Sequence, residues 1–451
     1  MLRPGALFVA ALATAAVFVG VLVAVKVWPG HQAALSVTVN GTTVYVDTAE
    51  SSRAYVEYGP TRAYGLFSAE SSAGRKHRVA LIGLEPGTRY HVRALALSSG
   101  RTRSGTDLIV SVPRVPVAHS LRVVGDRFEL DGRPWVPAFT WGSCATSYAA
   151  EAAVGIDAFM SSNCGDSPEQ QARAAFQVGG VLIPALDQVS RALPTTVATY
   201  YGDEPDLTRV PPAQLTKAWN THANAHGIPT FLTLSHLLIS AGRRNHALDA
   251  AYARLTDALG VDIYPIATTG DPNQIGEVAT AQQALRALAG GKPTFQWIEA
   301  TLPAGDSGST PTTAQIEAEA WMAIVNGARA LGWWTNGTSP FSVNADGLRA
   351  LRDVNTAIDT FTPAIDAPAA PVTLSNGGVD VFGTQLNGAL TVFAVNTSPV
   401  NTASETFTLP GLNGRPVRDW NTDQILPAVS GDTFADTLPP LAWRIYVIAP
   451  G

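Results

Sequence analysis

An alternation of short apolar runs with helix-like segments, between residues 135 and 334, most constrains the fold. The strand-like runs are 135–140, 155–160, 181–186, 197–201, 230–234, 260–266, 294–298 and 330–334. Helix-like segments between them include 211–226, 247–259, 273–288 and 312–329. Buried parallel strands have this continuous apolar character, and each needs a crossover to the next. Eight such units over about 240 residues predict a (β/α)8 TIM barrel.

Two details refine this prediction. A doubly wound sheet is the alternative architecture, but no glycine-rich phosphate loop follows the first strand-like run. The connection over 186–196 is too short for a full crossover helix, so we expect one abbreviated turn there. The barrel is therefore expected to occupy 118–365.

The segments on either side of the barrel have the alternating pattern of antiparallel strands. Within 34–112, the stretch from Leu84 to Tyr90 resembles the tyrosine corner of fibronectin type III domains, in which a tyrosine hydroxyl fastens a turn. The resemblance implies a β-sandwich that acts as a spacer. Alternation returns over 371–451, which predicts a C-terminal β-sandwich.

The N-terminal residues 1–30 contain an uncharged run from Gly5 to Val25, followed by Lys26. Its 21 residues match the roughly 20 that a helix needs to cross a bilayer. We expect a single-pass anchor that holds the bulk of the chain outside the cytoplasm, with the membrane as a partner. A cleaved signal segment, which would give a secreted protein, is the alternative.

Cysteine and charge content limit the other classes of function. Cys144 and Cys164 are the two cysteines, and an exported chain permits a disulfide between them, although unpaired thiols remain the alternative. No CxxC or HExxH motif occurs, so neither a metal nor another cofactor is expected. A net charge of −6 without a basic stripe argues against a nucleic-acid partner.

Two of the strand-like runs are followed by, or end in, a glutamate. Glu204 comes shortly after the run 197–201, and Glu299 follows 294–298. The C-terminal ends of barrel strands carry the chemistry of this fold. Two carboxylates facing one site can act as acid and as charged partner, which suits cleavage of a glycosidic bond. Glu204 and Glu299 are therefore the candidate catalytic pair.

On these residues, 120–365 resembles the retaining glycoside hydrolases of clan A. The resemblance implies Glu204 as acid/base and Glu299 as nucleophile, with Tyr264 donating a hydrogen bond to the nucleophile. It also implies aromatic sugar contacts. The further candidate substrate-binding residues are Trp141, His236, Trp333 and Trp334. Asp203 stands where the family usually has asparagine, and an ionised carboxylate can only accept hydrogen bonds.

These observations predict an extracytoplasmic glycoside hydrolase that acts on oligo- or polysaccharides by a retaining double displacement. A carboxylate separation of about 5 to 5.5 Å would favour retention, and about 6.5 to 9.5 Å would favour inversion. A carbohydrate-binding protein without turnover and an envelope-glycan transglycosylase are the alternatives. The sugar and its linkage are left open, because loops set them on this fold.

Overall fold

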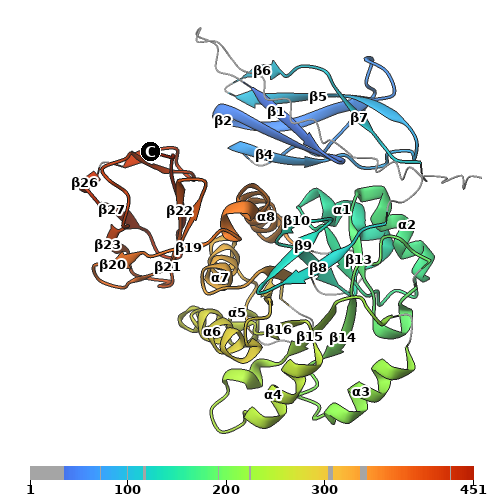
Figure 1. Cartoon of the computed structure of the whole chain (residues 1–451). Coiled ribbons are helices and arrows are strands. Elements are labelled where there is room, and N and C mark those ends of the chain that lie inside the picture. Colours follow the sequence, from blue (N-terminus) through green and yellow to red (C-terminus); the bar gives the residue numbers. More distant parts are fainter. Residues whose placement is uncertain are drawn as a thin grey trace, which may run out of the picture.

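The computed structural model describes residues 35–451, apart from 72, 99, 115–117, 191, 223–224, 303–307, 336–342 and 427. It contains an N-terminal antiparallel β-unit (35–111), a parallel eight-stranded sheet with its helices, and a C-terminal antiparallel β-unit (369–451). In Figure 1 the N-terminal β-unit (blue) lies along the side of the barrel near α1 and α8, and the C-terminal β-unit (red) lies beside α7.

The central sheet is a nearly closed barrel. Its strands are β11 (Ala138–Trp141), β12 (Ala158–Met160), β13 (Val181–Ile183), β14 (Thr199–Asp203), β15 (Thr230–Leu234), β16 (Ala258–Asp262), β17 (Thr294–Glu299) and β18 (Ala330–Trp334). Every neighbouring pair in the order β13-β12-β11-β18-β17-β16-β15-β14 is parallel. Isolated bridges join the two end strands, as at Leu182 and Thr196. The expectation of eight parallel strands is thus confirmed.

Aromatic side chains fill the barrel interior. Phe139, Phe295 and Trp297 contact one another edge to face, with ring centroids 5.2 to 6.4 Å apart. Two glycines make room for them. A Cβ atom on Gly260 would lie 2.1 Å from the Phe295 ring, and one on Gly332 would lie 2.4 Å from the Trp297 ring. The interior is therefore a packed core, and it supports the residues above it at the C-terminal ends of the strands.

The crossover helices cover the outside of the barrel. They are α1 (Tyr148–Ala153), α2 (Pro168–Val178), α3 (Pro212–Thr221), α4 (His246–Leu255), α5 (Pro265–Thr269), α6 (Glu277–Ala289), α7 (Thr313–Val325) and α8 (Ala345–Ile365). Short 3-10 turns accompany them, among them η1 (Ala145–Ser147), η2 (Leu186–Gln188), η4 (His236–Ile239) and η5 (Pro272–Gln274). Capping boxes begin α2 at Ser167 and α7 at Thr312. The turn η2 confirms the expected abbreviated connection between β13 and β14.

Two element boundaries differ from the sequence predictions in a way that affects the site. The strand predicted over 260–266 is β16, which ends four residues earlier, at Asp262. Pro265 then opens α5, because a proline is compatible with the first turn of a helix. The helix predicted over 247–259 ends at Leu255, which leaves Ala258 and Leu259 for β16.

A small antiparallel sheet precedes the barrel. It consists of β8 (Leu121–Val124), β9 (Arg127–Leu130) and β10 (Arg133–Trp135). Asp131 and Gly132 connect β9 to β10, with φ of 53° and 75°, as an Asp-Gly hairpin turn requires. Phe128 on β9 is fully buried and stacks on Phe231 of β15 at 5.4 Å, so this hairpin covers one end of the barrel core.

The N-terminal β-unit comprises β1 (Ser36–Asn40), β2 (Thr43–Gly59), β3 (Leu66–Phe67), β4 (Gly74–Ala80), β5 (Arg89–Ser98), β6 (Arg101–Ser104) and β7 (Leu108–Ser111). The long strand β2 pairs with β1 and β4 through its first half and with β3 and β5 through its second half. The hydroxyl of Tyr90 accepts a hydrogen bond from the Glu85 N–H at 2.9 Å, which is the contact expected of a tyrosine corner. The relation to fibronectin type III domains stays a prediction.

The C-terminal β-unit has two antiparallel sheets around one core. Its strands are β19 (Ala369–Ala370), β20 (Thr373–Leu374), β21 (Val379–Leu386), β22 (Ala389–Asn396), β23 (Ala403–Thr408), β24 (Val417–Asp419), β25 (Ile425–Leu426), β26 (Ala428–Ser430), β27 (Thr433–Leu438) and β28 (Trp443–Ile448). Trp443 stacks on Trp321 of α7 at 4.9 Å, and Phe393 stacks on the same indole at 5.9 Å. This unit is thereby attached to the barrel by an apolar contact.

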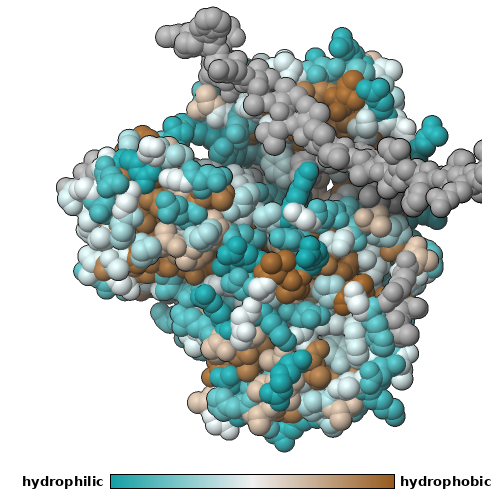
Figure 2. All heavy atoms as spheres, viewed as in Figure 1, coloured by the Kyte–Doolittle hydropathy of each residue, from teal (hydrophilic) through white to brown (hydrophobic). Residues whose placement is uncertain are grey.

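The prediction of a single-pass membrane protein is corrected here. Among the residues that the structure describes, no helix is both long enough and apolar enough to cross a bilayer. The run from Gly5 to Val25, on which that prediction rested, lies outside the described residues. On the face shown in Figure 2, hydrophobic residues lie in separate small patches among hydrophilic ones.

A largely buried ion pair fastens the N-terminal β-unit to the barrel. Arg78 of β4 pairs with Asp359 of α8, and its guanidinium also donates to the Ala152 carbonyl at 3.0 Å. Arg78→Ala would leave the carboxylate of Asp359 buried without its cation, so we expect a loss of about 3 kcal/mol in unfolding free energy. Arg53→Ala is the matched control, because Arg53 pairs with Glu70 on the surface and should contribute less than about 1 kcal/mol. Equal losses for both variants in thermal unfolding would contradict this assignment.

Candidate active site

Acidic side chains gather at the C-terminal ends of β14 and β16. Asp203 is the last residue of β14 and is exposed. Tyr200, which faces the barrel interior, donates a hydrogen bond from its hydroxyl to Asp203 Oδ1 at 2.6 Å. In a regular strand these two side chains would point to opposite faces. A register irregularity between Tyr200 and Gly202 brings them to the same side.

Glu204 follows β14 in a left-handed backbone conformation, with φ of 43°. Such conformations are uncommon for residues other than glycine and often occur at functional sites. Burial, and then the charges of Asp203 and Asp206, raise the pKa of Glu204 to about 7. Its carboxyl group accepts no hydrogen bond from the described residues, although its N–H donates to the Thr233 carbonyl at 3.0 Å. Glu204 can therefore hold a proton near neutral pH and has that proton available for a ligand.

Asp206 holds the loop that carries Glu204. It is buried, and both of its oxygens accept hydrogen bonds from Ser235 at the end of β15. The Ser235 hydroxyl donates to Oδ2 at 2.7 Å, and the Ser235 N–H donates to Oδ1 at 3.0 Å. These two bonds tie the loop after β14 to the loop after β15, which fixes the position of Glu204.

Asp262 ends β16 and is partly exposed. The hydroxyl of Tyr264 donates to Asp262 Oδ1 at 2.8 Å, whereas the sequence had led us to expect Glu299 as its acceptor. Burial, and then the charges of Glu204 and Asp203, raise the pKa of Asp262 well above its usual value. Asp203, Glu204 and Asp262 thus form one electrostatically coupled group, and like charges at this range cannot all ionise freely.

Three aromatic side chains flank this group. Trp141 at the end of β11 stacks on Trp334 at the end of β18, with ring centroids 5.9 Å apart and planes 20° apart. Tyr264 lies 6.0 Å from Trp334. All three are partly exposed. Indole and phenol rings beside carboxylates can pack on the apolar C–H faces of a sugar while the acids contact its oxygens.

Glu299 has different surroundings. It is the last residue of β17 and is fully buried. Its Oε1 accepts the Ile266 N–H at 2.7 Å, and its Oε2 accepts the Ala267 N–H at 2.6 Å, both from the first turn of α5. Burial, followed by the charge of Glu299 and a hydrogen bond with it, raises the pKa of Glu319 on α7 well above its usual value. Glu319 is therefore the protonated partner of Glu299.

Two other candidate residues lie outside the group formed by Asp203, Glu204 and Asp262. Trp333 is fully buried on the outer face of the sheet, where its Nε1 donates to Asn355 of α8 at 3.1 Å, so it cannot contact a ligand at the mouth in this structure. His236 is exposed at the start of η4, and its imidazole makes no hydrogen bond to the described residues.

Cys144 and Cys164 form a disulfide that joins the loops after β11 and β12. Within the described residues, the one group with metal-ligating geometry is these two cysteines with Asp166. The disulfide occupies both sulfur atoms, so this group does not form a metal site.

Sequence reasoning missed the roles of Asp262, Asp206, Tyr200 and Glu319. Asp262 carries the same signal as Glu204, a carboxylate at the end of an apolar run, but the predicted strand continued past it to 266. A proline at 265 could have indicated the earlier strand end. Tyr200 and Glu319 carry no such signal, because a bulge and a tertiary contact determine their partners.

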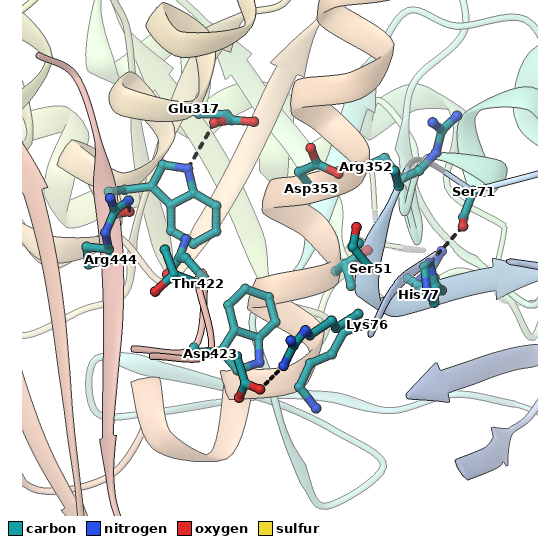
Figure 3. Close-up of a pocket in the computed structure, with 18 of the residues that line it drawn as sticks. Ser51, Ser71, Lys76, His77, Glu317, Arg352, Asp353, Thr422, Asp423 and Arg444 are labelled. Carbon is teal, nitrogen blue, oxygen red and sulfur yellow. Dashed lines mark hydrogen bonds and ion pairs between the residues drawn. The ribbon is translucent and has the colours of Figure 1, made fainter. Parts of the chain in front are cut away.

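A cavity with a volume of about 1060 Å³ lies elsewhere, at the junction of the two β-units with α7 and α8. Figure 3 shows its charged walls, where the Trp443 indole donates to Glu317 and Asp423 pairs with Arg75 of β4. Lys76 in the same wall pairs with Asp47. Arg75 and Asp423 thus already pair with each other across the junction. We place the candidate site at the barrel mouth.

Comparisons with known proteins add little to this description. No protein-family model matches the chain, and no curated protein matches it. A candidate alpha-galactosidase of Bacteroides fragilis is similar in structure, with a TM-score of 0.46 and 10% identity over 94% of this chain and 99% of that one. A GH30 endoxylanase of Clostridium papyrosolvens has a TM-score of 0.42 and 12% identity, over 73% and 99% respectively.

A beta-glucuronidase of Ruminococcus gnavus has a TM-score of 0.37 and 11% identity over 66% of this chain. The match spans 60% of the length of that enzyme. Likenesses this distant do not assign an activity. The strand order of this chain itself is what defines the barrel.

The raised pKa of Glu204 predicts a pH-dependent stability cost. Folding favours the protonated form of Glu204. The resulting contribution to the unfolding free energy is fully present below the unfolded pKa of about 4.5, and it is lost as the pH rises through about 7. Glu204→Gln cannot ionise, and we expect it to be more stable than the wild type by about 2 kcal/mol at pH 8 and equal to it at pH 4. Thermal unfolding at several pH values measures this, and Glu169→Gln is the control, because Glu169 is exposed on α2. A difference that does not change with pH would contradict the prediction.

Proposed function

We propose that this protein is a glycoside hydrolase whose site lies at the C-terminal mouth of the barrel. The observation that carries the proposal is the coupled group Asp203, Glu204 and Asp262 beside the rings of Trp141, Tyr264 and Trp334. Hydrolysis of a glycosidic bond needs one protonated and one ionised carboxyl group next to a surface on which a sugar ring can pack. Loops that join parallel strands at this end commonly supply such groups.

Glu204 is proposed as the general acid. It combines partial exposure, a carboxyl group without hydrogen-bond partners among the described residues, and a pKa raised to about 7. A protonated carboxyl can donate to the leaving oxygen as the glycosidic bond breaks, and its conjugate base can then activate water. An ionised carboxylate on the other side of the anomeric carbon completes a retaining double displacement.

Asp203 and the tyrosines are proposed to orient the sugar and the acids. The Tyr200 bond to Asp203 and the Tyr264 bond to Asp262 each use one carboxylate oxygen and leave the other for a ligand. Oligo- or polysaccharides are therefore the expected substrate class.

The test is product release by the full chain from a panel of polysaccharides and aryl glycosides. We expect Glu204→Gln to lower kcat/KM about 10² to 10⁴-fold on substrates with poor leaving groups. With dinitrophenyl glycosides, whose leaving group needs no proton, bond cleavage should be nearly unaffected. Glu169→Gln should match the wild type on every substrate.

Other outcomes would point to other functions. Sugar binding without release from any member of the panel would favour a carbohydrate-binding protein. Products longer than the substrate would favour a transglycosylase, because the same intermediate can be intercepted by a sugar hydroxyl. A uniform effect of Glu204→Gln on all leaving groups would contradict its role as the acid.

A further inference from the structure

The position of Glu299 is hard to reconcile with attack on a sugar. Its exposed fraction is 0%, and each carboxylate oxygen accepts a backbone N–H from α5 at 2.6 to 2.7 Å. Carboxylates held by backbone amides are stabilised in the charged form, and with no exposed surface neither oxygen of Glu299 is accessible to a sugar in this structure. Glu299 therefore acts as an anchor for the first turn of α5.

The surroundings of α5 are also fixed from the other side. The Gly308 N–H donates to the Ala267 carbonyl at 2.8 Å, and the Ser309 N–H donates to the Ile266 carbonyl at 3.1 Å. A Cβ atom at Gly308 would lie 2.2 Å from the Ile266 carbonyl oxygen, so this close approach needs glycine. The amides of residues 266 and 267 thus bind Glu299 while their carbonyls bind the segment after β17. Moving α5 away from Glu299 would break the two bonds to the carboxylate.

Asp262 differs from Glu299 in its exposure and in its hydrogen bonds. It lies on the same face of β16 as Ala258, which is part of the barrel interior, because side chains four residues apart share a face. It is partly exposed, and Tyr264 occupies only its Oδ1. Its other oxygen accepts no hydrogen bond from the described residues. The charges of Glu204 and Asp203 act on it directly, which places it in the same group.

We propose, on the basis of the proposed function above, that Asp262 and not Glu299 is the second catalytic carboxylate. Glu204 transfers its proton to the glycosidic oxygen, and the bonding pair leaves with that oxygen as the bond to the anomeric carbon breaks. Asp262 Oδ2 forms a bond to the same carbon, which gives a glycosyl ester. Water then attacks that carbon and gives its proton to Glu204, and the ester bonding pair returns to Asp262.

Tyr264 is the positioning residue for this step. Its hydroxyl donates to the Asp262 oxygen that does not attack, and this bond favours the ionised carboxylate. The charge of Glu204 opposes ionisation of Asp262 only while Glu204 is itself ionised. When Glu204 carries the proton, that repulsion disappears, and burial and the charge of Asp203 then still raise the pKa of Asp262.

The experiment compares the wild type with Asp262→Asn, Glu299→Gln and Glu319→Gln as full chains, with the aryl glycoside that the wild type cleaves best. A 2-deoxy-2-fluoro derivative of the same glycoside is used to trap the ester, and peptide mass spectrometry locates the label. We expect the label on Asp262, and at least a 10³-fold loss of kcat for Asp262→Asn with an unchanged Tm. Glu319→Gln, which can still donate to Glu299, should keep kcat within about tenfold.

Glu299→Gln places an amide N–H against a backbone N–H, so it should lower the Tm while its folded fraction keeps kcat within about tenfold. A label on Glu299, an active Asp262→Asn, or product of inverted configuration would overturn this assignment and leave the glycosidase intact. If the wild type neither cleaves nor is labelled by any compound of the panel, both proposals are overturned.

Discussion

The arrangement of this molecule is governed by the repulsion among carboxylates brought to one end of a parallel sheet. Taking a carboxylate out of water is unfavourable unless donors replace the solvent. The structure supplies a separate donor to most of them. Asp203 and Asp262 each receive a tyrosine hydroxyl, and Asp206 receives the hydroxyl and the N–H of Ser235. Glu204 receives no such donor from the described residues, and burial, followed by the charges of Asp203 and Asp206, raises its pKa to about 7.

The donors depend on the geometry of the barrel. Tyr200 reaches Asp203 because β14 contains a bulge, and Tyr264 reaches Asp262 because β16 ends there and Pro265 begins a helix. The aromatic interior beneath them is possible because Gly260 and Gly332 leave space for the Phe295 and Trp297 rings. The packing of the core and the positions at which the strands end therefore determine where the two tyrosine hydroxyls meet Asp203 and Asp262.

The amino-acid sequence predicted the elements better than the contacts between them. Apolar runs and the Asp-Gly turn located the barrel strands and the β9–β10 hairpin, because these signals are local. The partner of Tyr264 was predicted as Glu299 and is Asp262, since a strand that ends four residues early changes which carboxylate the loop meets. The buried pair of Glu299 and Glu319 joins a strand to a helix surface, and no local pattern indicates such a contact.

Helix α7 is buried on almost every side. Helices that are apolar all round lie inside a protein, and on this one the outward-facing Trp321 is covered by Phe393 and Trp443 of the C-terminal β-unit. During synthesis the barrel emerges before that cover, and the remaining residues take on the order of ten seconds to translate. For that interval Trp321 is an exposed apolar surface on a nascent chain. Quality-control factors that bind such surfaces would thus meet the barrel before its own C-terminal unit does.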